Sequence, residues 1–266
     1  MKYTYGPVRS RRYGWSLGID IMPKLKTCTY NCVYCELGKT SLKGHVNIRH
    51  QCEIAPRLKE DLTIELREKL VEASAYIDVI TFGYNGEPTL NRNLHIYHDL
   101  ARKLRFEAGI KKVPVTTLTN SSTLGDPTVR KVLSTFDIVV AKLDAGSQEI
   151  FHPISKPHVS VPPLKEIIKN IKLLKSEMKA GSNLYIQTLL FKVRTPSSLT
   201  SNATEENIAL IAKAVNDIVP DQVQIYTVKR PPAEPQVKAI THPELIKLSD
   251  FMANLVNSPI EVYHFH

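Results

Sequence analysis

The feature that most constrains the fold is a regular alternation of strand-like and helix-like segments along most of the chain. Short apolar stretches are each followed by a longer stretch in which apolar residues recur every three or four positions. Six such strand–helix units in series predict a parallel sheet with right-handed crossovers. We therefore expect an α/β fold, namely a partial (β/α)6 barrel with an extra edge strand at its C-terminal end.

Local signals set the expected boundaries. Strands are expected at 17–21, 77–82, 113–118, 137–143, 184–191, 222–228 and, as the edge strand, 260–265. Helices are expected at 56–75, 91–109, 126–134, 164–179, 204–218 and from 241 onward. Asn91 and Asp126 are expected to cap two of these helices, and Thr241 with Glu244 predicts a capping box for the last.

The length and hydropathy of the chain limit how many domains it can form. A chain of 266 residues can bury a substantial core without disulfides, and no long linker or repeat divides it. We expect one domain over 1–266, with an N-terminal arm at 1–14, a core at about 15–228 and a C-terminal loop, helix and strand at 229–266. No apolar run approaches 18 residues and no secretory h-region follows the basic N-terminus, which predicts a cytoplasmic protein without a membrane partner.

The strongest chemical signal is a cluster of cysteines. Cys28, Cys32 and Cys35 form a CxxxCxxC motif directly after the first expected strand. Thiolates at this spacing can hold one iron–sulfur cluster, and three ligands for four irons leave one iron open to a small chelating molecule. In a parallel βα architecture the loops after the strands form the reactive face, and this loop is one of them.

The motif resembles the signature of the radical S-adenosylmethionine superfamily, which follows the first strand of a partial (β/α)6 barrel. The resemblance implies that Cys28, Cys32 and Cys35 hold a [4Fe–4S] cluster whose open iron binds S-adenosylmethionine. It implies an enzyme in which reductive cleavage of that cofactor gives a 5′-deoxyadenosyl radical, which abstracts hydrogen from a substrate. An electron donor such as a flavodoxin or ferredoxin is then an expected partner.

Further segments at successive strand ends are similar to cofactor-contacting segments of that superfamily. Phe82-Gly-Tyr-Asn-Gly-Glu-Pro88 resembles its GGEP motif, with Asn85 in place of one glycine, so the resemblance places Gly86 and Glu87 at the amino group of the cofactor. It also implies cofactor contacts for residues at four other places: Tyr34 in the cysteine motif, Asn120 and Ser121 after the third strand, Asp144 after the fourth, and Gln187 on the fifth. Tyr226 on the sixth strand is a weaker candidate.

Two other classes remain open on the residues alone. A structural zinc site would take Cys52 or His45 as a fourth ligand, and an electron-transfer protein would hold a fully ligated cluster. The spacing of the cysteines matches no standard zinc finger. Cys52 has no place in the signature.

Within the superfamily, the order of motifs resembles the wyosine-synthase-like group, which modifies transfer RNA. The resemblance includes Gly6-Pro-Val-Arg-Ser-Arg-Arg12 and Val228-Lys-Arg-Pro-Pro-Ala-Glu234. No cysteine precedes Cys28, so the second cluster of the better-known members cannot form, and a shorter branch is expected. RNA is one expected substrate, in keeping with the net charge of +9, and a small molecule or peptide is the alternative. Arg9, Arg11 and Arg12 could bind a phosphate or the carboxylate of the cofactor, or they could form a solvated arm.

Overall fold

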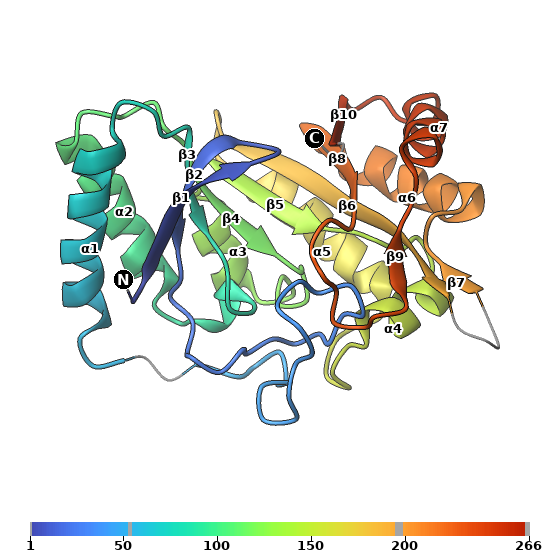
Figure 1. The fold of residues 1–266 in the computed structure, drawn as a ribbon, viewed down its shortest axis with the longest axis horizontal. Helices are drawn as coiled ribbons and strands as arrows, with labels where there is room; N and C mark the ends of the chain where they lie inside the picture. The colour runs from blue at the N-terminus through green and yellow to red at the C-terminus, as the bar shows by residue number, and fades with distance from the viewer. Residues whose placement is uncertain (1, 53–54, 195–198, 264–266) are drawn as a thin grey trace.

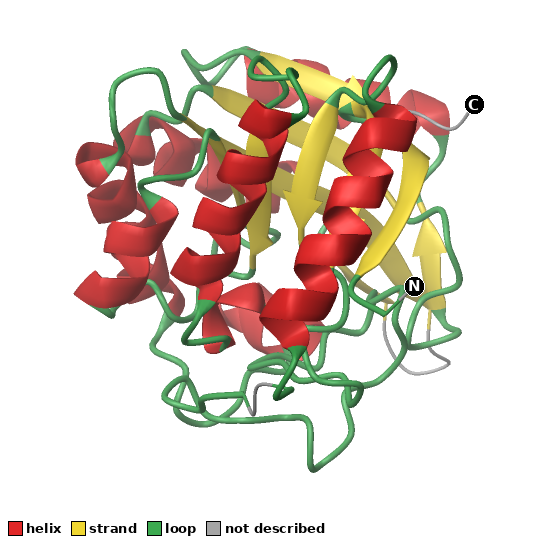
Figure 2. Ribbon diagram, turned by 90° about the vertical axis from the view of Figure 1, so that its left-hand side faces the viewer, coloured by secondary structure: helices red, strands yellow, loops and turns green. Residues whose placement is uncertain are grey.

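A computed structural model describes residues 2–52, 55–194 and 199–263, and these form a curved sheet with helices along one face (Figures 1 and 2). The sheet order is β1-β2-β3-β4-β5-β6-β8-β10, and all neighbours from β2 onward are parallel. The expected partial barrel of parallel strands is therefore confirmed.

The strands are β1 (Thr4–Ser10), β2 (Gly14–Ile19), β3 (Val79–Phe82), β4 (Val115–Thr119), β5 (Ile138–Lys142), β6 (Asn183–Arg194), β7 (Leu199–Ser201), β8 (Gln222–Thr227), β9 (Val237–Ala239) and β10 (Ile260–Tyr263). The α-helices are α1 (Leu58–Ala73), α2 (Leu94–Glu107), α3 (Pro127–Leu133), α4 (Gln148–Ser155), α5 (Leu164–Glu177), α6 (Glu205–Ile218) and α7 (His242–Ala253), and Pro88–Leu90 forms a 3-10 turn. The expected C-terminal strand is β10, which pairs parallel to β8; residues 264–266 lie outside the described residues.

The helices form where the apolar periodicity places them. Leu58, Leu62, Leu66 and Leu70 make one buried stripe along α1, because positions four apart lie on one face of a helix. Asp126 caps α3 by accepting from the Thr128 amide, and Thr241 and Glu244 form the expected capping box of α7.

Four features differ from the sequence expectation. Residues of the expected N-terminal arm form β1, which pairs antiparallel with β2. Helix α4 and the short strands β7 and β9 were not expected; both strands pair antiparallel with the end of the long strand β6. Asn91 does not cap α2, because the helix begins at Leu94 with Asn93 at the cap position, and the Asn91 side chain instead donates to the Ile21 carbonyl.

The two faces of the sheet have different chemistry. The face beneath the helices is apolar, with Val139, Ala141 and Ile186 buried in the core. The opposite, concave face carries buried polar side chains: Ser16 and Thr81 share a 2.8 Å hydrogen bond, and Gln187 and Gln224 lie on neighbouring strands. A polar interior leaves the barrel able to receive something other than its own core side chains.

Candidate functional site

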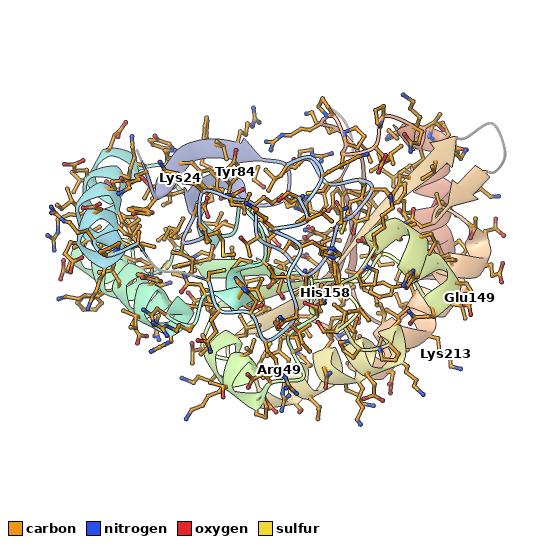
Figure 3. All side chains as sticks on the ribbon, turned by 90° about the horizontal axis from the view of Figure 1, so that it is seen from below. Lys24, Arg49, Tyr84, Glu149, His158 and Lys213 are labelled. Atoms are coloured by element: carbon orange, nitrogen blue, oxygen red, sulfur yellow. The ribbon has the colours of Figure 1, made fainter. Side chains whose placement is uncertain are left out.

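The cysteine segment lies in the long loop between β2 and α1, which runs across the edge where the parallel strands end (Figure 1). Single backbone bridges fix its path: Thr27 pairs with Gly86, Cys28 with His45, and Tyr30 with Pro157. Seen from this edge, His158 lies near the middle of the molecule and Tyr84 and Lys24 lie toward one side (Figure 3). The loop is thus fastened at several points to the carboxyl ends of the strands.

Gly86 allows the closest of these contacts. Its φ is +132°, and a Cβ atom at this position would lie 1.8 Å from the Thr27 carbonyl oxygen. The Glu87 amide donates to that same oxygen at 3.0 Å. Only glycine permits this approach, so the Gly86-Glu87 pair positions the backbone directly before Cys28.

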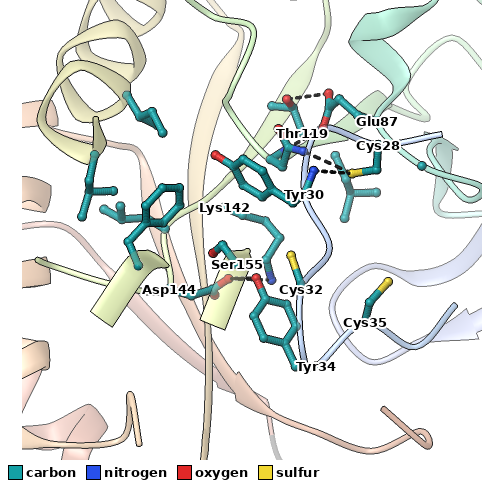
Figure 4. A pocket seen from close by; sticks show the side chains of 17 residues that line it. Cys28, Tyr30, Cys32, Tyr34, Cys35, Glu87, Thr119, Lys142, Asp144 and Ser155 are labelled. Carbon is teal, nitrogen blue, oxygen red and sulfur yellow. Dashed lines mark hydrogen bonds and ion pairs between the residues drawn. The ribbon is translucent and has the colours of Figure 1, made fainter. Parts of the chain in front are cut away.

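All three motif cysteines face one cavity (Figure 4). Of the residues predicted from the sequence, Tyr34, Gly86, Glu87, Asn120 and Asp144 also line it. The remaining lining residues are Tyr30, Leu118, Thr119, Lys142, Leu143, Phe151, Ser155, Leu164 and Ile167. One cavity thus unites the cysteine loop with the ends of the third, fourth and fifth strands in the sheet order.

The cysteines are free thiols close enough to influence one another electrostatically. Burial raises the pKa of Cys28 to about 12, with a further contribution from Glu87. Burial also raises the pKa of Cys32, and the neighbouring Cys28 and Cys35 add to the shift. The Lys26 ammonium lies 3.2 Å from the Cys35 sulfur, so a cation lies beside the third thiol.

Glu87 is buried beneath the cysteine loop, and protein donors occupy both of its carboxylate oxygens. Oε1 accepts from the hydroxyls of Thr89 and Thr119 at 2.6 and 2.8 Å, and Oε2 accepts from the Asn120 amide at 2.7 Å. Desolvation raises the pKa of Glu87, while these hydrogen bonds oppose the shift. The carboxylate therefore ties the end of β4 to the Gly86 turn.

Asn120 joins the end of β4 to the first cysteine. Its amide nitrogen lies 3.4 Å from the Cys28 sulfur and 2.9 Å from the Thr29 hydroxyl. Ser121, the next residue, is buried with φ +68° and lies outside the lining of the cavity. Gln187 also lies outside it, on the concave face, where it accepts a hydrogen bond from the Tyr226 hydroxyl at 2.9 Å.

Asp144, at the end of β5, contacts several of the residues around another part of the cavity. One carboxylate oxygen accepts from the Leu189 amide at 2.7 Å, and the other accepts from the Tyr34 hydroxyl and lies 3.4 Å from the Lys142 ammonium. Burial alone would lower the pKa of Lys142, but Asp144 and Tyr226 outweigh it and raise that pKa. Lys142 is thus a partly buried cation that lines the cavity. It was not predicted from the sequence, although it directly precedes Leu143 and Asp144 at the strand end.

Cys52 and His45, the two residues considered as a fourth zinc ligand, do not line the cavity that the three motif cysteines face. Cys52 lies in a separate small core with Met22 and Leu90. The His45 ring lies 3.2 Å from the Thr29 carbonyl oxygen and packs edge to face on His158. Within the described ranges, no three His, Cys, Asp or Glu side chains are arranged to hold a single metal ion.

A C-terminal segment that we name the latch, residues 229–236, covers the cysteine loop. The Glu234 amide donates to the carbonyl of Val33, between the second and third cysteines. The Glu234 carboxylate pairs with Lys39 and Lys156 at 3.3 and 3.1 Å. The latch is thus fastened to the cysteine loop.

The N-terminal arginines divide between two environments. Arg9 is exposed on β1. Arg11 and Arg12 lie at the turn between β1 and β2, and both guanidinium groups lie over the ring of Tyr226 on β8. They do not form a solvated arm.

A partial parallel barrel that presents three cysteines to a cavity at the carboxyl ends of its strands has the design of an iron–sulfur enzyme. A family model described as the radical SAM superfamily matches residues 22–199, which include all three cysteines and the strand ends around them. The chain belongs to the radical SAM superfamily. Its cofactors are accordingly a [4Fe–4S] cluster and S-adenosylmethionine.

The site fits these cofactors on structural grounds. Cysteine sulfur is the usual ligand of iron–sulfur clusters, and three mutually close thiols, none in a disulfide, face a common cavity. A cluster of several irons extends over more space than one ion, so its ligands need to face one cavity rather than meet at one point. Asn120, Lys142 and Asp144 line the same cavity, and their polar side chains can contact a second, polar ligand beside the cysteines.

Two sequence relatives match nearly the whole of this chain. A Brachyspira hyodysenteriae protein named GTPase Obg is 32% identical over 98% of this chain and 35% of its own length. A UPF0026 protein of Helicobacter pylori is 33% identical over 95% of this chain and 74% of its own length. The chain therefore spans about a third of the first relative and about three quarters of the second.

Solved structures share the fold at low identity. Streptococcus suis SuiB bound to S-adenosylmethionine superposes with a TM-score of 0.63 at 13% identity, over 94% of this chain and 51% of that one. TYW1 with a lysine-pyruvate adduct bound gives 0.61 at 12% identity, over 93% and 76%. These likenesses are ones of fold.

Proposed function

We propose that this protein is a radical SAM enzyme in which Cys28, Cys32 and Cys35 hold the [4Fe–4S] cluster. The observation that carries the proposal is the single cavity in which these three thiols face the ends of β4 and β5. A reduced cluster held by these three cysteines would supply the one electron needed to cleave S-adenosylmethionine to methionine and a 5′-deoxyadenosyl radical, which would abstract hydrogen from the substrate. We propose that residues 1–266 form a single radical SAM domain. We also propose that the protein is cytoplasmic, because its four cysteines are free thiols, which is typical of a reducing compartment.

The chain's own residues have distinct tasks in this proposal. Gly86 and Glu87 border the amino end of S-adenosylmethionine and fix the backbone before Cys28. Asn120 orients the first cysteine through its 3.4 Å contact with the sulfur. Tyr34 and Asp144, joined by a hydrogen bond, form the wall against the nucleoside, and Ser121 and Gln187 act from outside the cavity lining by positioning its walls.

The substrate that we propose is RNA, in line with the resemblance of the chain's motifs to the wyosine-synthase-like group. The net charge of +9 supports a polyanionic partner. A small molecule or a peptide is the alternative. A flavodoxin or ferredoxin is proposed as the electron donor.

Formation of 5′-deoxyadenosine tests the reaction. Anaerobically reconstituted protein with dithionite and S-adenosylmethionine should produce it, and Cys32→Ala should abolish it together with most of the bound iron. Cys52→Ala is the matched control, since Cys52 lies in a separate core, and should retain product formation. Purified protein with one zinc per chain and no iron or sulfide would contradict the proposal. A cluster whose spectrum does not change when S-adenosylmethionine is added would also contradict it.

Binding of bulk transfer RNA over a salt series tests the substrate. Phosphate contacts give an affinity that falls steeply with salt concentration. Weak binding with no salt dependence would favour a small molecule or peptide.

A further inference from the structure

The Lys26 side chain contacts the turn that follows the third motif cysteine. Its ammonium lies 3.2 Å from the Cys35 sulfur and also donates to the Gly38 carbonyl. The Gly38 amide in turn donates to the Cys35 carbonyl at 3.1 Å, which closes the turn. The charge of Lys26 is therefore held beside the sulfur by the same turn that carries that sulfur.

The backbone around Lys26 is also fixed. An added Cβ at Gly44 would lie 2.0 Å from the Lys26 carbonyl oxygen, so these two parts of the loop pack closely. The next residue, Thr27, pairs with Gly86, and its amide donates to the Asn85 carbonyl at 3.3 Å. The Lys26 side chain therefore extends from a backbone that contacts with two other segments hold in place.

The charge of Lys26 is not neutralised by a neighbouring carboxylate. Among the described residues, no Asp or Glu forms an ion pair with its ammonium. Glu36, next to Cys35 in the sequence, pairs instead with Arg230 at 3.0 Å. Lys142, the cation that lines the cavity, differs in this respect, because it lies 3.4 Å from the Asp144 carboxylate.

We propose that Lys26 raises the reduction potential of the [4Fe–4S] cluster, acting through the Cys35 sulfur as a positioning residue. This inference rests on the proposed function, which assigns the cluster to Cys28, Cys32 and Cys35, and it adds a residue on which the reduction step depends. One-electron reduction adds a negative charge near the three sulfurs, and a cation beside one of them stabilises that charge. Hydrogen bonds to the sulfurs and net charge are among the factors that set the potential of such clusters.

The position of Lys26 separates this role from cofactor binding. Lys26 is not among the residues that line the cavity, whereas Cys35 is. Its ammonium therefore acts on the cluster through the cysteine, without a place in the space that S-adenosylmethionine would occupy. The readout that reports this role is the potential of the cluster in the absence of S-adenosylmethionine.

A redox titration of the anaerobically reconstituted protein, followed by electron paramagnetic resonance with dithionite as the reductant, tests the proposal. Lys26→Met removes the charge and the donor at similar side-chain length. The equilibrium constant for one-electron reduction should fall by about tenfold or more, and tenfold corresponds to a potential lower by about 59 mV. Lys26→Arg keeps the charge and should restore most of the difference.

Lys24→Met is the matched control. It removes the same charge from an exposed position two residues earlier in the same loop (Figure 3). Because water and salt screen exposed charges, the equilibrium constant should change by less than about threefold. Equal potentials in the wild type and Lys26→Met would overturn the proposal, as would equal shifts in Lys26→Met and Lys24→Met.

Iron and sulfide per chain are measured first for each variant. If Lys26→Met does not hold a cluster, Lys26→Gln, which keeps an amide donor without the charge, takes its place and should also lower the potential. Loss of the cluster in both neutral variants would show that Lys26 is needed for assembly and would overturn the assignment to the potential.

Failure of this inference is distinguishable from failure of the proposed function. Wild-type protein without a cluster that responds to S-adenosylmethionine would overturn the proposed function, and the role of Lys26 with it. Wild-type protein with such a cluster, whose potential is unchanged in Lys26→Met, would overturn the role of Lys26 alone.

Discussion

Single residues at the cysteine loop act mainly by fixing backbone positions. Gly86 makes room for the Thr27 carbonyl. Glu87 accepts hydrogen bonds from Thr89, Thr119 and Asn120, while its own amide donates to the Thr27 carbonyl. Asn120 then reaches the Cys28 sulfur. The first cysteine is therefore positioned by groups from two separate segments, at Gly86-Glu87 and at Asn120, before any cofactor is bound.

Gly86→Ala should break this arrangement. The added Cβ would meet the Thr27 carbonyl at 1.8 Å in a backbone conformation that alanine rarely adopts. We expect a loss of about 2–4 kcal/mol in the free energy of unfolding and a fall of more than half in iron bound after reconstitution. Gly125→Ala is the control, because its Cβ would meet only the Asn170 side chain at 3.5 Å. Normal iron content in Gly86→Ala would refute the role given to this turn.

At the scale of elements, the site depends on pieces distant in sequence. The latch holds the cysteine loop from the C-terminal side, and the first hairpin reaches β6 and β8 from the N-terminal side. Hydrogen-bonded pairing of the parallel strands fixes their register and brings their ends together.

Glu234→Gln tests the latch. It removes two partly exposed ion pairs, with Lys39 and Lys156, which together are worth about 0.5–1 kcal/mol. Opening of the loop should become easier by that amount, so a chelator should remove iron about two- to fivefold faster. Glu68→Gln, exposed on α1, should leave the rate unchanged. Identical rates for both variants would show that the latch does not restrain the loop.

His98 makes the packing of α2 sensitive to pH. Its ring is buried and stacks on Phe136 at 4.0 Å, and burial lowers the pKa of His98 to about 4. The unfolded chain binds this proton below about 6.5, so the contribution to stability is complete above that pH and is lost as the pH falls toward 4. The loss amounts to about 3 kcal/mol.

Urea unfolding at pH 7 and pH 4.5 measures this effect. His98→Leu should lose less stability than the wild type between the two pH values. His95→Leu, exposed on the same helix, should follow the wild type. Parallel pH profiles for all three proteins would show that His98 is not the titrating group.

At the scale of the whole molecule, the fold class followed from periodicity, and local caps such as Asp126 and Thr241 were read correctly. The cysteines and the strand ends were also predicted, because parallel strands bring their carboxyl ends to one edge. Three features were not predicted from the sequence, because each depends on contacts between segments that are distant along the chain. They are the pairing of β9 with β6, the contact of the latch with the cysteine loop, and the contacts of Arg11 and Arg12 with Tyr226. Lys142 was missed because alternation along a strand shows which residues share a face but not what that face meets.

No helix among the described residues combines the length and apolar character needed to cross a bilayer. Buried polar side chains lie on the concave face of the sheet and around the cavity that the three motif cysteines face. An enclosed site suits radical chemistry, because solvent and stray hydrogen donors are kept away from the reacting atoms.

The most direct test of the central claim is the electron paramagnetic resonance spectrum of the anaerobically reconstituted, dithionite-reduced protein, recorded with and without S-adenosylmethionine. We predict a reduced [4Fe–4S] signal that changes when S-adenosylmethionine is added and that is absent in Cys32→Ala. A spectrum without this signal, or one indifferent to S-adenosylmethionine, would contradict the assignment of Cys28, Cys32 and Cys35 to a cluster with an open iron.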